Sequence, residues 1–199
     1  MKFFDSHAHL DDEKFNEDRE KVIKEIHKEI DKFVSAGYSL EGSEVAVKLA
    51  QKYDFVYATC GISPNDIPQT EEELWTMLNK IKNLVQESIK IVAIGEIGLD
   101  YYWNKENKEI QKLAFIEQIK LANELNLPIV IHTREAVMDT IEILKQHPVE
   151  NKGIFHCCPL NRELVKEALK LGFYISFAGS VTFKNSQNAD EIINLVPND

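Results

Sequence analysis

The sequence predicts an α/β fold in which parallel strands alternate with covering helices, as in a TIM-type (β/α)8 barrel. Seven short apolar runs alternate with segments of helical periodicity along the 199 residues. Regular alternation of this kind is typical of a parallel sheet covered by helices. No G-x-G-x-x-G follows the first strand, so a dinucleotide-binding fold lacks direct support. A complete barrel takes about 250 residues, so we expect one domain, residues 1–199, with about seven of the eight β/α units.

The first three β/α units are predicted from apolar runs and from apolar positions spaced three or four residues apart. Gly37 ends the second strand. The sequence Thr70-Glu71-Glu72-Glu73 is a capping box, which begins the third helix. The predicted strands are 2–5, 30–36 and 55–60, and the predicted helices are 17–28, 42–53 and 70–87.

The remaining units follow the same alternation. Pro128 precedes the fifth strand, a position where proline is tolerated, and Pro148 and Gly172 follow predicted helices. In the fourth strand, Ile94 and Glu96 are expected to share one face, since side chains alternate. The predicted strands are 91–96, 129–132, 153–156 and 173–177, and the predicted helices are 107–125, 134–146, 161–170 and 189–195.

Composition narrows the cellular context and the partners. The net charge of −10 argues against a broad nucleic-acid-binding face, although bound cations would reverse the local field. No apolar run reaches the about 18 residues that span a bilayer, and the N-terminus does not resemble a signal peptide. The three cysteines form no disulfide framework. We therefore expect a cytoplasmic protein with no membrane association and no stable protein partner.

Metal-binding residue types recur at the ends of the predicted strands. If residues 2–9 are extended, His7 and His9 lie side by side on one face, with Asp5 deeper on the same face. An isolated H-x-H carries little weight, but the carboxyl ends of barrel strands meet at one rim, where catalytic residues lie. The side chains that this rule brings together are His7, His9, Glu96, His132 and His156.

Four imidazoles and one carboxylate are too many for a single open tetrahedral site, which takes three protein ligands. A carboxylate can bridge two cations, so two divalent ions (Mg, Mn or Zn) that share Glu96 account for the set better. Paired metals activate water and stabilise both oxygens of an in-line displacement at phosphorus. The residues thus predict a two-metal hydrolase with Glu96 as its central catalytic residue.

Five segments resemble the TatD family of metal-dependent deoxyribonucleases, in matching order along essentially the whole chain. They are DSHAHLD (5–11), GEIGLDYY (95–102), IHTREA (131–136), FHC (155–157) and FYISFAGSVTFKN (173–185). The resemblance implies an amidohydrolase-like TIM barrel with a two-metal site. It also implies hydrolysis of DNA phosphodiesters, often as a 3′-exonuclease, and the same five metal ligands.

Two substitutions depart from the family pattern within the expected site. Ser63 stands where the family pattern G-I-H-P has a histidine near the substrate phosphate, so it can donate a hydrogen bond but no positive charge. Cys158 stands where the family has phenylalanine. It either approaches the metals on the face of His156 or fills space as a small apolar residue.

The family continues into an eighth strand with a Glu-Thr-Asp motif, whose aspartate is a metal ligand. The sequence ends at Asp199 before such a motif, so we expect a C-terminal truncation and unpaired edges on the first and seventh strands, which favour association. Loss of the eighth-strand aspartate would weaken binding of the metal on His7 and His9 more than binding of the other metal. We therefore expect the ion on Glu96, His132 and His156 to bind first.

Several neighbouring residues have two possible roles. Arg134 either binds substrate phosphate as a bidentate donor or forms an ion pair with Glu96 or another nearby acid. Asp100 either orients a ligand histidine or fixes its loop. The aromatic residues 101–103 either stack on bases or pack at the rim. Cys60 is expected in the core, and His27 is expected to be solvated.

Three functions remain open at this stage. The first is a two-metal phosphodiesterase with DNA as its substrate. The second is an amidohydrolase-type enzyme that cleaves a C–N or ester bond, since a fold does not determine a function. Many enzymes of that type bridge their metals with a modified lysine on the fourth strand, so Glu96 favours the nuclease. The third is an inactive metal-binding fragment.

Overall fold

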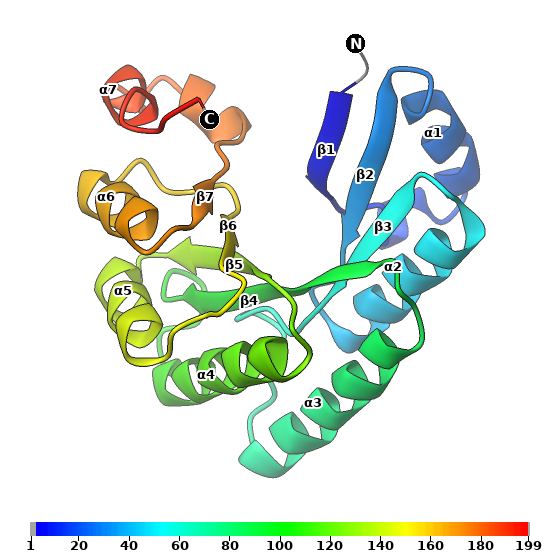
Figure 1. Ribbon diagram of the computed structural model, residues 1–199, viewed down its shortest axis with the longest axis horizontal. Helices are drawn as coiled ribbons and strands as arrows, with labels where there is room; N and C mark the ends of the chain where they lie inside the picture. Colours follow the sequence, from blue (N-terminus) through cyan, green and yellow to red (C-terminus); the bar gives the residue numbers. More distant parts are fainter. Residues whose placement is uncertain (1–2, 199) are drawn as a thin grey trace.

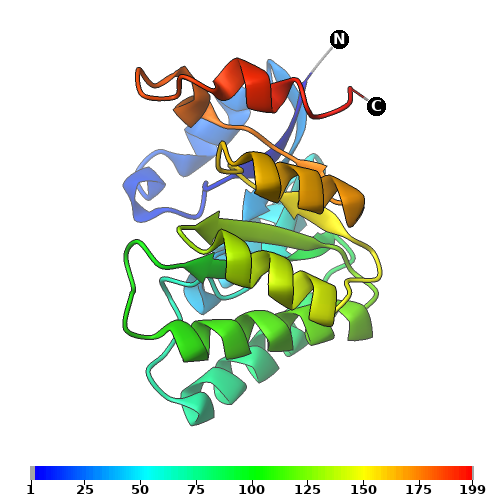
Figure 2. The same ribbon diagram turned by 90° about the vertical axis from the view of Figure 1, so that its left-hand side faces the viewer.

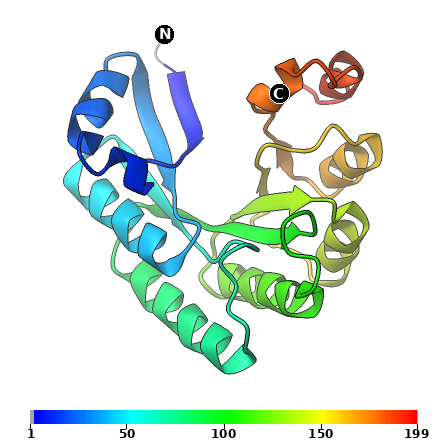
Figure 3. The same cartoon turned by 180° about the vertical axis from the view of Figure 1, so that it is seen from behind.

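The computed structural model describes residues 3–198, in which seven parallel strands form one curled sheet (Figure 1). The strands are hydrogen bonded in sequence order, from β1 to β7. Helices cover the outer face, and Figure 2 shows α4, α5 and α6 side by side along it. Seen from behind, β1 and β7 lie on opposite sides of an opening (Figure 3). The predicted α/β barrel-type fold is therefore confirmed as a curled half-barrel.

The bounds of the elements follow the predicted alternation. The strands are β1 Phe3–Ala8, β2 Ile30–Ala36, β3 Val56–Cys60, β4 Ile91–Asp100, β5 Ile129–Arg134, β6 Gly153–Phe155 and β7 Tyr174–Ile175. The α-helices are α1 Arg19–Ile26, α2 Leu40–Lys52, α3 Glu71–Gln86, α4 Lys108–Glu124, α5 Val137–Gln146, α6 Arg162–Lys170 and α7 Ala189–Ile193. Two 3₁₀ helices, Glu13–Phe15 and Gly179–Thr182, were not predicted.

Three of the strands that lead to the candidate site, β1, β4 and β5, extend beyond their predicted ends, whereas β6 ends at Phe155, one residue before its predicted end. β4 continues past Glu96 to Asp100 because Gly98, Leu99 and Asp100 stay paired with β5. β5 likewise extends to Arg134, so α5 begins at Val137 rather than at residue 134. Between them, Glu135 has a positive φ of 52°, which is incompatible with a helix that begins there.

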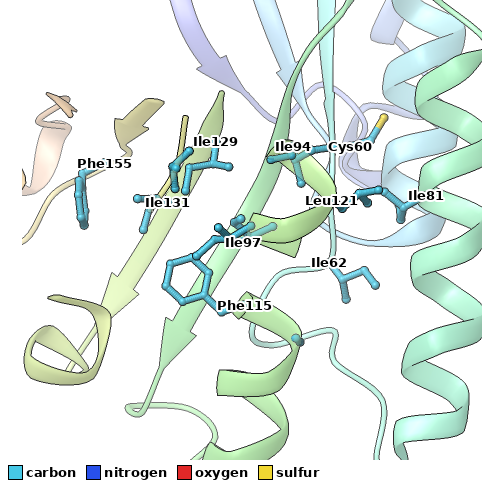
Figure 4. Packing of buried hydrophobic residues seen from close by; sticks show 14 of the residues in the cluster. Cys60, Ile62, Ile81, Ile94, Ile97, Phe115, Leu121, Ile129, Ile131 and Phe155 are labelled. Atoms are coloured by element: carbon cyan, nitrogen blue, oxygen red, sulfur yellow. The ribbon is translucent and has the colours of Figure 1, made fainter. Parts of the chain in front are cut away.

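The predicted alternation along β4 is wrong at Glu96. The register between β4 and β5 shifts between Ile94 and Ile97. Ile94 consequently belongs to the core between the sheet and the helices (Figure 4), whereas Glu96 contacts histidines of the site. An irregularity in pairing of this type re-aims a side chain, and such irregularities are common next to active sites.

Helix starts are set by the side chains that the sequence offers. Thr70 accepts a hydrogen bond from the backbone N–H of Glu73 (3.3 Å) and donates its hydroxyl to the Glu73 carboxylate (3.0 Å). The predicted N-cap at Thr70 is therefore confirmed, but the Glu73 carboxylate contacts the Thr70 hydroxyl and not the Thr70 backbone N–H that a capping box uses. Ser39 caps α2 by accepting from the N–H of Gly42, so this helix begins two residues before the predicted start.

The core lies between the outer face of the sheet and the helices (Figure 4). Ile97, Ile131 and Phe115 are fully buried there, and full burial of one such side chain stabilises the fold by about 1.5–3 kcal/mol. Cys60 and Cys158 are buried as well, in agreement with a packing role. The predicted solvation of His27 is wrong, because its ring stacks on Phe55 at 3.6 Å between centroids.

The open edges of the sheet expose apolar side chains. Within residues 3–198, β1 pairs with β2 alone and β7 with β6 alone. Phe3 and Phe4 on β1 and Tyr174 on β7 are mostly exposed. Among the helices that the structure describes, none is both long enough and apolar enough to traverse a membrane.

Gly98 offers a direct test of how β4 and β5 fit together. Its φ is +140°, and a Cβ atom there would overlap the carbonyl oxygen of His132. We expect Gly98→Ala to lower the free energy of unfolding in urea by at least about 2 kcal/mol, since both strain and a clash are introduced. The control is Gly179→Ala, where nothing lies within 4 Å of the added Cβ. Equal effects of the two substitutions would contradict this account.

Candidate metal centre

Glu96 occupies the centre of the candidate site. Its side chain is almost fully buried, and its backbone N–H donates to the carbonyl of Gly37 at the end of β2 (2.8 Å). The preceding Gly95 lies against β5, where an added Cβ would meet the Val130 side chain at 2.7 Å. The backbone on both sides of Glu96 is therefore fixed by neighbouring strands, which places its carboxylate inside the curled sheet.

One oxygen of Glu96 faces His7 of β1 and His9, which directly follows that strand. Oε2 lies 3.2 Å from Nε2 of His7 and 3.6 Å from Nε2 of His9. The two Nε2 atoms are 3.1 Å apart. Ligands at the corners of a tetrahedron with bonds of about 2.0–2.1 Å are roughly 3.3 Å apart. The three atoms therefore have the mutual spacing that a single cation requires.

The other oxygen of Glu96 faces β5. Oε1 lies 3.0 Å from Nδ1 of His132, and Nε2 of His132 lies 3.0 Å from Oδ2 of Asp100. His156 follows β6, and its ring stacks on that of His7 with centroids 3.4 Å apart and planes 10° apart. The structure thus brings all five predicted residues together, three around Glu96 directly and His156 through His7.

The two predicted substrate-binding residues lie in different surroundings. The Ser63 hydroxyl donates to Oδ2 of Asp66 (2.6 Å), so its proton is already engaged. Arg134 places its guanidinium carbon 3.9 Å from the centre of the Tyr102 ring. Among the residues that the structure describes, Arg134 has no carboxylate partner, so the alternative of an ion pair with Glu96 is not seen.

Asp100 has both of the roles that the sequence left open. Its Oδ2 contacts His132, while its Oδ1 accepts the N–H groups of Tyr102 (2.9 Å) and Trp103 (3.0 Å). The buried Gln111 of α4 fixes the Asp100 backbone by accepting from its N–H (2.9 Å) and donating to its carbonyl (3.1 Å). Sequence analysis missed Gln111, although a glutamine within the buried stripe of a helix is a signal for such a role.

His9 is also held by its surroundings. Its Nδ1 lies 3.1 Å from the carbonyl of Ala36, which fixes the proton on Nδ1 and leaves Nε2 as an acceptor directed at the site. Both carboxylate oxygens of Asp11 are buried without a hydrogen-bond partner, and Oδ1 is 3.9 Å from His9 Nδ1. Burial raises the pKa of Asp11 to about 6, and burial together with His7 lowers the pKa of His9.

Charge in the site is concentrated on Glu96 and His132. Burial alone would raise the pKa of Glu96, but hydrogen bonds from His132 and His7 outweigh it and hold this pKa well below its usual range. Burial would likewise lower the pKa of His132, but its contacts with Asp100 and Glu96 raise it to about 9. His156 has no such partner, and burial and the nearby His7 lower its pKa to about 4.

The donor set fits a divalent cation. His7, His9 and Glu96 each offer one atom, and these atoms lie within 4.8 Å of one another. Nδ1 of His156 is buried without a hydrogen-bond partner, which leaves this nitrogen available to bind an ion. The expectation that the ion on Glu96, His132 and His156 binds first stays a prediction.

Comparison with known proteins identifies the family of the chain. The family model described as TatD related DNase matches residues 4–199. The chain belongs to the TatD family. Among its relatives, the uncharacterized metal-dependent hydrolase YabD of Bacillus subtilis (strain 168) is 44% identical and aligns over 98% of this chain and 76% of its own. The uncharacterized metal-dependent hydrolase YcfH of Escherichia coli (strain K12) is 36% identical over 100% of this chain and 75% of its own.

Solved structures of TatD proteins share the fold. YJJV, a TatD homolog from Escherichia coli K12, superposes with a TM-score of 0.89 at 25% identity, over 98% of this chain and 75% of that chain. A TatD family hydrolase from Entamoeba histolytica gives a TM-score of 0.85 at 23% identity, over 99% of this chain and 71% of that one. The family match and the sequence relatives show that this protein is a metal-dependent hydrolase of the TatD family.

The raised pKa of His132 predicts the pH dependence of stability in the metal-free protein. A folded-state pKa of about 9 exceeds the unfolded value of about 6.5, so the contribution is complete below pH 6.5 and is lost as pH rises to 9. In EDTA, we expect the free energy of unfolding to fall by about 3 kcal/mol over this range. Urea titrations at pH 6 and pH 9.5 measure this change.

Two variants isolate the contribution of His132. His132→Gln should show a smaller loss between the two pH values, while His147→Gln, at the end of α5, should behave as the wild type. A wild-type slope retained in His132→Gln would show that the raised pKa is not the cause.

Proposed function

We propose that this protein hydrolyses phosphodiester bonds in DNA with two divalent metals, as a 3′-exonuclease-type deoxyribonuclease. One observation carries the proposal. The buried Glu96 presents Oε2 to His7 and His9 and Oε1 to His132, which suits a carboxylate that bridges two cations. The description of the matching family model, TatD related DNase, supports the same reaction.

The residues divide into two sets that share Glu96. In the proposed site, His7, His9 and Glu96 would hold one divalent ion, and Glu96, His132 and His156 the other. When bound, two such ions supply Lewis-acid activation of water and of the phosphodiester. Glu96 is suited to its role because its low pKa keeps it ionised at neutral pH.

Other side chains prepare the site for a phosphodiester. Asp100 orients His132, and the Ala36 carbonyl orients His9, so the ligand nitrogens are directed before any ion binds. Arg134 lies over the Tyr102 ring and has no carboxylate partner among the described residues, which leaves its N–H groups for a substrate phosphate. Ser63 is less suited to that task while its hydroxyl donates to Asp66.

The reaction is tested with 3′-labelled single-stranded DNA in Mg²⁺ or Mn²⁺. We expect release of 3′ nucleotides that EDTA abolishes. Glu96→Gln should lower kcat/KM by at least about 10²-fold, because loss of even an outer partner of a metal ligand costs about 10–100-fold. The matched control is Glu150→Gln, at an exposed position whose carboxylate has no contact in the described structure.

A substrate panel separates the proposal from the amidohydrolase-type alternative. Amide, lactone and phosphodiester substrates are compared at one metal concentration. Turnover of amides or lactones without cleavage of DNA, or DNA cleavage that survives EDTA and Glu96→Gln, would rule out the proposed function.

A further inference from the structure

The loop after β4 exposes two aromatic side chains beside the candidate metal centre. Tyr102 is 42% exposed and Trp103 67% exposed, and their rings meet edge to face at 4.7 Å. Tyr101 differs, because it is buried and donates its hydroxyl to Asp139 (2.6 Å). Of the three aromatic residues in the loop, one packs into the fold and two remain available on the rim.

Arg134 lies beside the two aromatic side chains and adds a positive charge to this surface. Its guanidinium carbon lies 3.9 Å from the Tyr102 ring centre and 5.4 Å from that of Trp103. Among the described residues the guanidinium has no carboxylate partner, so its N–H groups are available, and their geometry matches a phosphate. Aromatic faces next to a free arginine are what proteins use to hold single-stranded nucleic acid.

The surface is fixed relative to the metal centre. Asp100 accepts the N–H groups of Tyr102 and Trp103 with Oδ1 and contacts His132 with Oδ2. Arg134 pairs with Asp100 in the β4–β5 register and follows His132 by two residues on β5. One carboxylate therefore sets the position of both a candidate metal ligand and the aromatic loop.

We propose that Tyr102, Trp103 and Arg134 form a stacking site for an unpaired nucleobase, with the Arg134 N–H groups on the adjoining phosphate. This inference rests on the proposed function and names the side chains that would hold a base of the substrate strand. A base inside a duplex has both faces covered by its neighbours, so it cannot present one to Trp103. The site thus selects strands whose terminal bases are unstacked.

The two tryptophans of the chain, Trp75 and Trp103, allow a binding test that needs no catalysis. Trp75→Phe leaves Trp103 as the sole indole. In EDTA, a single-stranded oligonucleotide should quench its fluorescence to saturation. A blunt duplex, or an oligonucleotide of the same length with abasic 3′-terminal positions, should not. In the wild-type background, Trp103→Ala should raise the Kd for single-stranded DNA about tenfold.

Trp75→Ala is the matched control, since Trp75 is also an exposed indole but lies on α3. Its Kd should equal that of the wild type. Equal Kd values for wild type, Trp103→Ala and Tyr102→Ala, or equal quenching by the abasic oligonucleotide, would overturn the stacking site.

A kinetic comparison separates this proposal from the proposed function. Wild type should prefer the base-bearing oligonucleotide over the abasic one in kcat/KM, and Trp103→Ala should reduce that ratio about tenfold. An unchanged ratio overturns the stacking site while hydrolysis of DNA stands. If the wild type cleaves neither oligonucleotide but Trp103 is still quenched by single-stranded DNA, the proposed function fails and the stacking site is supported.

Discussion

The buried carboxylate of Glu96 is the constraint on which the rest of the site depends. A carboxylate placed inside a protein is costly unless opposite charge and hydrogen bonds compensate for its lost hydration. Here two imidazoles compensate, His7 of β1 on one side of the carboxylate and His132 of β5 on the other. The site therefore joins the first strand of the half-barrel to its centre, and a cation would replace protons as the source of positive charge.

The surrounding structure holds this carboxylate and its partners in place by backbone geometry. Gly95 permits close approach of β5, and Gly98 permits close approach of the His132 carbonyl. From the outer layer, Gln111 of α4 fixes Asp100, which in turn fixes His132. Helix packing on the outside of the sheet is thereby linked to the orientation of a candidate metal ligand on the inside.

Much of this arrangement could be predicted from sequence, because period-2 strands and apolar helix stripes are local signals. That His7, Glu96 and His132 lie near one rim follows from parallel topology, since the carboxyl ends of the strands meet there, but the inward direction of Glu96 does not. The lengths of β4 and β5 could not be predicted, because they depend on pairing between residues such as Gly98 and His132. The shift of register before Ile97 breaks the alternation, so Glu96 faces inward for a reason that no periodicity reveals. The role of Arg134 was left open and that of His27 was predicted wrongly for the same reason, since their aromatic partners are set by tertiary contacts.

The most direct test of the central role of Glu96 is the anomalous diffraction of crystals grown with Mn²⁺. The account predicts two peaks roughly 3.5–4 Å apart, the spacing of paired catalytic metals. One should lie beside Glu96 Oε2 with His7 and His9, and the other beside Oε1 with His132. A single peak, or two peaks that Glu96 does not contact, would contradict the account.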